Sequence, residues 1–247
     1  MENRLIPLLV DDSFRHDSVL IFPGGGYDHV SLQKEGETVA KALNKEHLNA
    51  FVLNYRVYPH SRKEIMADAV DAVRKVRHLF MKHGVSGNKL AIMGFSAGGH
   101  LAMMEAEHYR DIIMENGWSD SEDCRPDAVV LCYPVVTFSE SCVHVGSRMN
   151  FLGHQDAADD DLRIMYSAEK GICSGLPPVF LWHCAGDDSV PMNNSILLRD
   201  ALDRVGVDNR LKIYQGGSHG LGLAQDHAEI SGWFSECITW LCEKGFQ

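Results

Sequence analysis

Short apolar runs alternate along the chain with longer stretches whose apolar positions recur at helical spacing. The apolar runs have the length of buried strands and lie at 19–22, 50–55, 90–93, 128–133, 179–183 and 211–214. The helical spacing predicts helices over 35–45, 65–80, 100–108, 193–205 and 230–241, the second of which ends at Gly84. This alternation predicts an α/β fold with a mostly parallel sheet that helices cover on both sides. Right-handed crossovers favour a doubly wound sheet.

One long segment breaks the alternation. Residues 135–178 are irregular, rich in Ser, His, Asp and Gly, and longer than an ordinary connection. Two interpretations remain open: a small cap over a site, or a surface excursion with one short helix near 159–167. The 247 residues contain no stretch that looks like a linker, so we expect a single α/β domain over 1–247.

Candidate chemistry appears first at a Gly-x-Ser-x-Gly pattern, in which Ser96 stands between Gly94 and Gly98. The pattern follows the strand at 90–93 and precedes a helix, which is the context of a nucleophile elbow. Small neighbours let a serine hydroxyl stand clear of a sharp turn. The alternative is a glycine-rich turn in which Ser96 simply caps the following helix.

A serine hydroxyl becomes a good nucleophile only when an oriented base takes its proton. Asp187 and Asp188 follow the strand at 179–183, and His219 follows the strand at 211–214. The carboxyl ends of parallel strands open on one edge, so these residues are expected to meet Ser96 there. The order Ser96, Asp187, His219 is the chain order expected for such a sheet.

Other histidines compete for the role of base. His100 is the main rival, but it lies one helical turn beyond Ser96 and is expected to pack behind the elbow. For His144, His154 and His183 we favour solvated or hydrogen-bonded structural roles over a place in the pocket. No ligand spacing supports a metal site.

A glycine-rich loop follows the first strand and spells Pro-Gly-Gly-Gly-Tyr over residues 23–27. Glycines let backbone N–H groups approach a reacting carbonyl closely. We therefore expect the N–H groups of Gly25 and Gly26, together with that of Ala97, to form an oxyanion hole. Tyr27 either lines an acyl pocket or belongs to the core.

Taken together, these motifs resemble the α/β-hydrolase fold, in particular its esterase/lipase branch with acetylxylan-esterase-like and feruloyl-esterase-like proteins. The resemblance spans 19–240 and implies that Asp187, three positions before Val190, is the triad acid. It also implies short acyl esters, often on carbohydrates, as substrates. Two departures are visible: Pro23 stands where many relatives have histidine, and the chain begins close to the third strand of the usual eight. We therefore expect a compact form with a variant loop and short or absent leading strands.

The amino-acid composition argues against some classes of binding partner and some cellular locations. The formal net charge of −11 argues against a nucleic-acid backbone or an anionic membrane. The seven cysteines form no Cys-x-x-Cys pair, which is typical of reduced thiols. No signal peptide is recognised in 1–10, and no apolar run is long enough to cross a bilayer, so a cytoplasmic protein is expected.

The resulting hypothesis is a serine carboxylesterase that needs no cofactor and no metal and acts on a small-molecule ester. Ser96 attacks, His219 transfers the proton and Asp187 orients the imidazole. Two alternatives stay open: an amide or peptide hydrolase, arylformamidase-like or prolyl-peptidase-like, and a non-catalytic binding protein on a hydrolase scaffold. Formation of a homo-oligomer also stays open.

Overall fold

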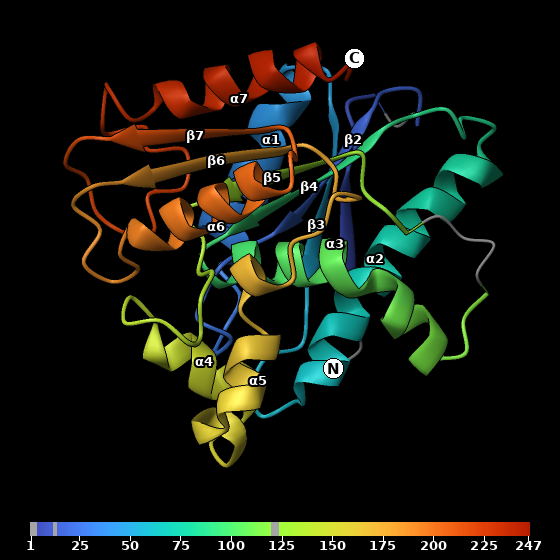
Figure 1. Ribbon diagram of the computed structural model, residues 1–247. Coiled ribbons are helices and arrows are strands. Elements are labelled where there is room, and N and C mark those ends of the chain that lie inside the picture. The colour runs from blue at the N-terminus through green and yellow to red at the C-terminus, as the bar shows by residue number, and fades with distance from the viewer. Residues whose placement is uncertain (1–3, 12–13, 120–123) are drawn as a thin grey trace.

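A twisted sheet runs through the centre of the molecule, with helices on both of its faces (Figure 1). The computed structural model describes residues 4–11, 14–119 and 124–247. Within these residues the sheet has seven strands in the order β1-β3-β2-β4-β5-β6-β7. The strands are β1 Arg4–Leu8, β2 Ser18–Phe22, β3 Asn49–Asn54, β4 Leu90–Phe95, β5 Ala128–Cys132, β6 Val179–Cys184 and β7 Asn209–Tyr214.

All neighbouring strands from β3 to β7 in this order are parallel, and β1 alone pairs antiparallel, with β3 at the sheet edge. The six apolar runs each coincide with a parallel strand. β1 was not predicted, because it is only five residues long and contains Pro7, a residue that weakens the expectation of a strand. One leading strand is therefore present, and it is short.

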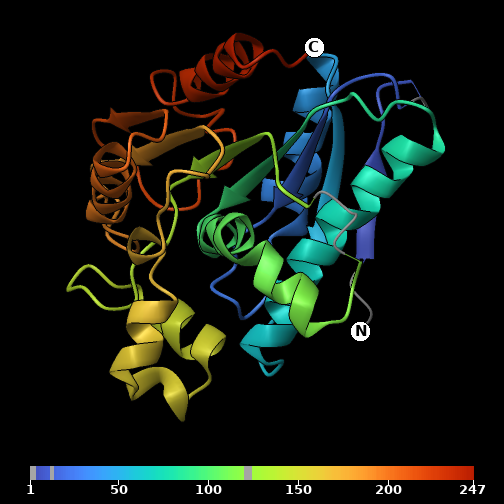
Figure 2. The ribbon, with the colours of Figure 1, turned by 45° about the vertical axis from the view of Figure 1, so that its right-hand side comes forward.

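Two hydrophobic clusters fill the space between the sheet and its helices. Helices α2 Arg62–Lys82, α3 Ala97–Glu115 and α6 Asn193–Arg204 cover one face, and α1 Thr38–Lys45 and α7 Gly232–Glu243 cover the other. Figure 2 shows the same two layers of helices after a turn of 45° about the vertical axis. The prediction of a doubly wound, mostly parallel sheet is confirmed.

Two helices differ most from their predicted bounds. The helix expected over 35–45 begins as a π-helix, η1 Leu32–Glu37, and continues as α1. The helix expected over 100–108 begins earlier, at Ala97, and ends later, at Glu115. The wider π-helical turn is a local departure that frequently accompanies functional sites.

The irregular segment 135–178 holds four short helices within the described chain: α4 Val145–Leu152, η2 Asp156–Ala158, α5 Asp160–Met165 and η3 Ala168–Lys170. In both ribbon views α4 and α5 lie side by side, away from the sheet (Figures 1 and 2). The predicted short helix near 159–167 is α5, while α4 was not predicted. The Asn150 side chain on α4 donates to the Gly26 carbonyl, so the segment packs against the glycine-rich loop.

The part of the chain that the structure describes contains no helix of the length and apolar character needed to span a bilayer. All seven cysteines lie among the described residues, and all of them are free thiols.

The start of α2 offers a direct test of a local contribution to stability. The Ser61 hydroxyl accepts from the Glu64 N–H, and the Glu64 carboxylate accepts from the Ser61 N–H, which is a complete capping box. We expect Ser61→Ala to lower the free energy of unfolding by about 1 kcal/mol, because an N-cap acceptor is lost. Urea denaturation followed by circular dichroism measures this change.

Ser235→Ala is the matched control, because Ser235 is exposed on α7 and its hydroxyl only bonds to the Gly232 carbonyl. Equal losses of stability in both variants would contradict the assigned role of the capping box.

Candidate active site

Ser96 occupies the sharp turn between β4 and α3, with φ 52° and ψ −121°. This turn requires glycine at two flanking positions. A Cβ atom on Gly94 would lie 2.3 Å from the Gly98 carbonyl oxygen, and one on Gly98 would lie 2.0 Å from the Phe22 carbonyl oxygen. The Ser96 side chain makes no capping bond to α3, so the interpretation of Ser96 as a helix cap is wrong.

The Ser96 hydroxyl lies 2.7 Å from Nε2 of His219, and Nδ1 of His219 lies 2.7 Å from Oδ2 of Asp187. Three separate connections carry these groups: the turn after β4, the loop after β6 and the loop after β7. A carboxylate beside Nδ1 can only accept, so the proton of a neutral ring sits on Nδ1. Nε2 is then the free acceptor for the serine proton, as a general base requires.

Asp187 is held from several directions. Its Oδ1 accepts from the N–H groups of Ser189 and Val190 at 3.0 and 2.9 Å, and His183 Nε2 lies 3.3 Å from Oδ2. Burial on its own would raise the pKa of Asp187, but these donors together with His219 outweigh it and hold the pKa below its usual value. Asp187 therefore stays ionised at neutral pH. Asp188 is exposed.

His100, the main rival base, is completely buried behind the elbow. Its two ring nitrogens lie 2.8 Å from the Tyr27 hydroxyl and 2.8 Å from the Tyr166 carbonyl oxygen. Burial lowers the pKa of His100 to about 4. Tyr27 itself is fully buried, so of its two predicted places the core is the right one.

The other histidines also have structural partners. His183 is buried, with Nδ1 2.8 Å from the Ser195 hydroxyl and Nε2 2.8 Å from the Val190 carbonyl. The Val190 carbonyl and the Asp187 carboxylate are both acceptors, which places the His183 proton on Nε2. His154 is exposed beside the Tyr58 ring, 5.2 Å between centroids.

His144 lies beside the glycine-rich loop. Its Nδ1 accepts from the Ser147 N–H at 3.1 Å and caps α4. Burial lowers the pKa of His144, and the nearby His219 acts in the same direction. A Cβ atom on Gly26 would be 3.9 Å from its ring, so α4 begins directly beside the glycine-rich loop.

Two residues of the glycine-rich loop after β2 have positive φ angles, which favour glycine. Gly25 has φ 128° and Gly26 has φ 63°, and a Cβ atom on Gly25 would lie 2.2 Å from the His29 carbonyl oxygen. The Gly24 N–H is occupied by the Glu35 carboxyl group at 2.8 Å. Within the described residues, the N–H groups of Gly25, Gly26 and Ala97 have no backbone acceptor.

Two buried polar residues near the site were not predicted. Glu35 accepts from the Tyr133 hydroxyl at 2.7 Å, and the Tyr133 ring lies 5.1 Å from the His219 ring. A lone glutamate in an amphipathic stretch usually faces solvent, and a tyrosine that ends an apolar strand usually belongs to the core. Neither residue therefore carried a signal of its own in the sequence.

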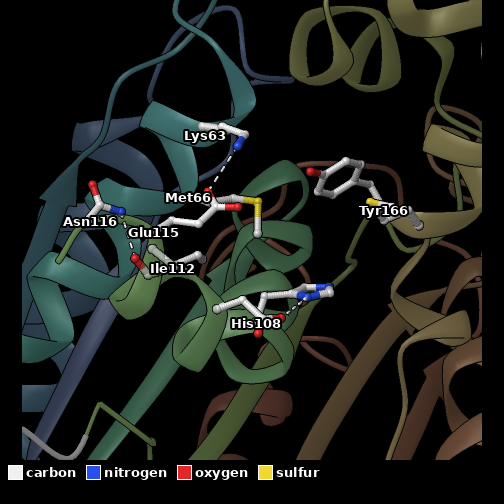
Figure 3. A pocket seen from close by; sticks show the side chains of 9 residues that line it. Lys63, Met66, His108, Ile112, Glu115, Asn116 and Tyr166 are labelled. Atoms are coloured by element: carbon white, nitrogen blue, oxygen red, sulfur yellow. Dashed lines mark hydrogen bonds and ion pairs between the residues drawn. The ribbon is translucent and has the colours of Figure 1, made fainter. Parts of the chain in front are cut away.

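A separate cavity of about 140 Å³ lies between α2, α3 and the end of α5 (Figure 3). Lys63 and Glu115, two of the side chains that line it, form an ion pair at 3.2 Å. Ser96, Asp187 and His219 do not line it. Among the residues that the structure describes, no three His, Cys, Asp or Glu side chains converge to hold a metal ion.

Comparison with known proteins places the chain in a family. The model of the BD-FAE family matches residues 11–202. Endo-1,4-beta-xylanase B of Butyrivibrio fibrisolvens is 35% identical over 233 residues, which are 93% of this chain and 36% of that protein. An acetylxylan esterase of Xylanibacter ruminicola is 34% identical over 204 residues, 81% of this chain and 40% of that protein. The chain thus spans well under half the length of these two relatives.

Among solved structures, an acetyl ester-xyloside bifunctional hydrolase from Caldicellulosiruptor lactoaceticus superposes with a TM-score of 0.88 and 38% identity. The match covers 99% of this chain and 89% of that one. A carboxylesterase from Lactobacillus plantarum, at 21% identity and a TM-score of 0.77, shares the fold.

The geometry of Asp187 predicts how reactive Ser96 is. A fluorophosphonate probe should label Ser96, and Asp187→Asn should slow labelling at least about a hundredfold, because an amide no longer holds the His219 proton on Nδ1. Asp188→Asn is the matched control and should label at the rate of the unmodified protein. Intact-mass spectrometry over time measures both rates. Equal slowing in the two variants would contradict the assignment of Asp187.

Buried His100 predicts a loss of stability in acid. Burial holds the pKa of His100 at about 4 in the folded protein, below the ordinary histidine value of about 6.5. Between these values the unfolded chain binds a proton that the folded protein does not, so stability falls as the pH falls through this window. From about pH 7 to about pH 5 this group should remove about 2 kcal/mol. Urea denaturation at both pH values, with NMR titration of the His100 ring, measures it; a ring that titrates near its ordinary value would refute the prediction.

Proposed function

This chain belongs to the BD-FAE family, and we propose that it is a serine esterase that removes short acyl groups, above all acetyl, from sugars. One observation carries the proposal: the continuous hydrogen-bonded series Ser96 hydroxyl, His219 imidazole, Asp187 carboxylate, with 2.7 Å at each step. That series is the arrangement that converts a serine hydroxyl into a nucleophile.

In the proposed reaction, Ser96 Oγ attacks the ester carbonyl while His219 Nε2 takes its proton. The ionised Asp187 keeps the ring in the required tautomer and stabilises the imidazolium that forms. His219 then gives the proton to the leaving alcohol, which departs and leaves an acyl group on Ser96. A water molecule, deprotonated by the same ring, hydrolyses this ester and frees the acid. No cofactor takes part in these steps.

The negative charge that develops on the carbonyl oxygen needs donors that are already in place. We assign this role to the N–H groups of Gly25, Gly26 and Ala97. Their lack of a backbone acceptor in the described chain supports the assignment. Ala97 is the first residue of α3, so the helix dipole adds a favourable field at the same point.

Substrate class is proposed from the relatives and from the surroundings of the site. One relative is an acetylxylan esterase, and one of the similar solved structures is an acetyl ester-xyloside bifunctional hydrolase. We propose that 135–178 acts as a small cap within one α/β-hydrolase domain, since its α4 begins beside Gly26. The seven free thiols support the proposed cytoplasmic location.

A series of p-nitrophenyl esters from acetyl to long acyl chains tests this function, run beside p-nitroacetanilide and acetylated xylo-oligosaccharides. We expect acetyl esters to be hydrolysed faster than long-chain esters, and the anilide to be cleaved far more slowly. Ser96→Ala should lower kcat/KM at least about a thousandfold, since the nucleophile is lost. Ser235→Ala, on the exposed face of α7, should retain full activity.

Other results would change the assignment. Faster cleavage of the anilide would indicate an amide hydrolase with the same residues. A preference for long acyl chains would contradict the substrate class, and turnover independent of Ser96 would contradict the mechanism.

A further inference from the structure

The proposed reaction does not use Glu35, yet its carboxyl group bonds to two of the segments that surround the site. Glu35 is only 4% exposed and stands in the π-helix η1 rather than in a regular α-helix. Burying a carboxyl group is unfavourable unless donors compensate it. Both of its oxygens have donors here, one from each of two different loops.

The first donor belongs to the glycine-rich loop. The Gly24 N–H donates to Oε2 of Glu35 at 2.8 Å. Gly24 packs tightly between this carboxyl group and the elbow. A Cβ atom on Gly24 would lie 2.8 Å from Glu35 Oε2 and 2.9 Å from Ser96 Cβ. Glu35 therefore fixes the residue that directly precedes the proposed oxyanion donors Gly25 and Gly26.

The second donor leads to the loop that carries His219. The Tyr133 hydroxyl donates to Oε1 of Glu35 at 2.7 Å and accepts from the Gly222 N–H at 2.8 Å. Burial raises the pKa of Tyr133 far above its usual value, so the hydroxyl keeps its proton and its direction of donation. The Tyr133 ring also packs edge-on against the His219 ring, 5.1 Å between centroids.

The backbone of η1 supports the same two loops. A Cβ atom on Gly222 would lie 3.3 Å from the Lys34 carbonyl oxygen, so η1 packs directly on the His219 loop. The wider π-helical turn thus has one residue against that loop and the next bonded to the glycine-rich loop. Tyr133 completes the connection with φ 38°, an unusual value for a residue other than glycine.

We propose that Glu35 and Tyr133 are positioning residues that lock the oxyanion loop and the His219 loop at a fixed distance from each other. This inference rests on the proposed function for its catalytic meaning. Ser96 and the donor Ala97 directly follow β4, whereas the base and the donors Gly25 and Gly26 sit on the loops after β7 and β2, two strands that do not pair with each other. The bonded series from the Gly24 N–H through Glu35 and Tyr133 to the Gly222 N–H supplies the missing connection.

Kinetics of three variants test the inference. Tyr133→Phe keeps the ring against His219 but removes the hydroxyl, and Glu35→Gln keeps the shape but replaces one acceptor with a donor. Each should lower kcat about 10- to 100-fold, because small displacements of reacting groups carry costs of that size. KM should change less than about threefold, since the substrate-binding surface is retained.

Tyr214→Phe is the matched control. It also removes a tyrosine hydroxyl that donates to a carboxylate, that of Glu236, but on the α7 side of the sheet. We expect its kcat to stay within about twofold of the unmodified protein. A purely structural role for Tyr133 would instead give equal kcat in the two tyrosine variants at equal melting temperature, and would overturn the inference.

Amide hydrogen exchange gives a readout that needs no activity. Tyr133→Phe should raise exchange in a peptide covering 218–224, because the Gly222 N–H loses the hydroxyl that accepts its hydrogen bond. Tyr214→Phe should leave that peptide unchanged. Unchanged exchange in Tyr133→Phe would refute the coupling of the loops even if the protein proves inactive on esters, whereas inactivity of the unmodified protein would refute only the proposed function.

Discussion

The whole site depends on the sharp turn at Ser96, where positions 94 and 98 leave no room for a side chain. The backbone of Ser96 adopts φ 52°, and the flanking glycines pack within van der Waals distance of β2 and α3. That close approach brings the end of β2, with its glycine-rich loop, up to the nucleophile. A side chain at Gly94 or Gly98 would force β2, β4 and α3 apart, and the oxyanion donors would then move away from Ser96.

The sheet supplies the rest of the arrangement by its direction alone. Parallel strands β2, β4, β6 and β7 all end on one edge, so the loops that follow them converge although their residues are far apart in sequence. Bringing the loops to one edge does not by itself fix the distances between the reacting groups, because a loop can shift by more than a proton transfer tolerates. Asp187 is held by two backbone N–H groups and by His183, and Glu35 with Tyr133 bonds two further loops together. These buried hydrogen bonds thus hold the loops that carry the reacting groups in fixed positions.

Local signals in the sequence account for much of this structure. Most of the parallel strands contain continuous apolar runs, whereas β7 alternates apolar residues with Arg210 and Lys212. The meaning of the elbow pattern depends only on its neighbours in the sequence. The structure brings Ser96, His219 and Asp187 together, but the choice between Asp187 and Asp188 needed a family resemblance, because both follow the same strand. Three features were beyond local reasoning: β1 exists through pairing with β3, α4 lies in an irregular segment, and the burial of Glu35 depends on partners about a hundred residues away.

The central claim is that Ser96 carries the acyl group during turnover, and acid quenching during the hydrolysis of p-nitrophenyl acetate tests it most directly. Peptide mass spectrometry of the quenched protein should find one acetyl group on the peptide that contains Ser96, and none after the ester is exhausted. Acetylation at another residue, or turnover with no acetylated intermediate at any time point, would contradict this account.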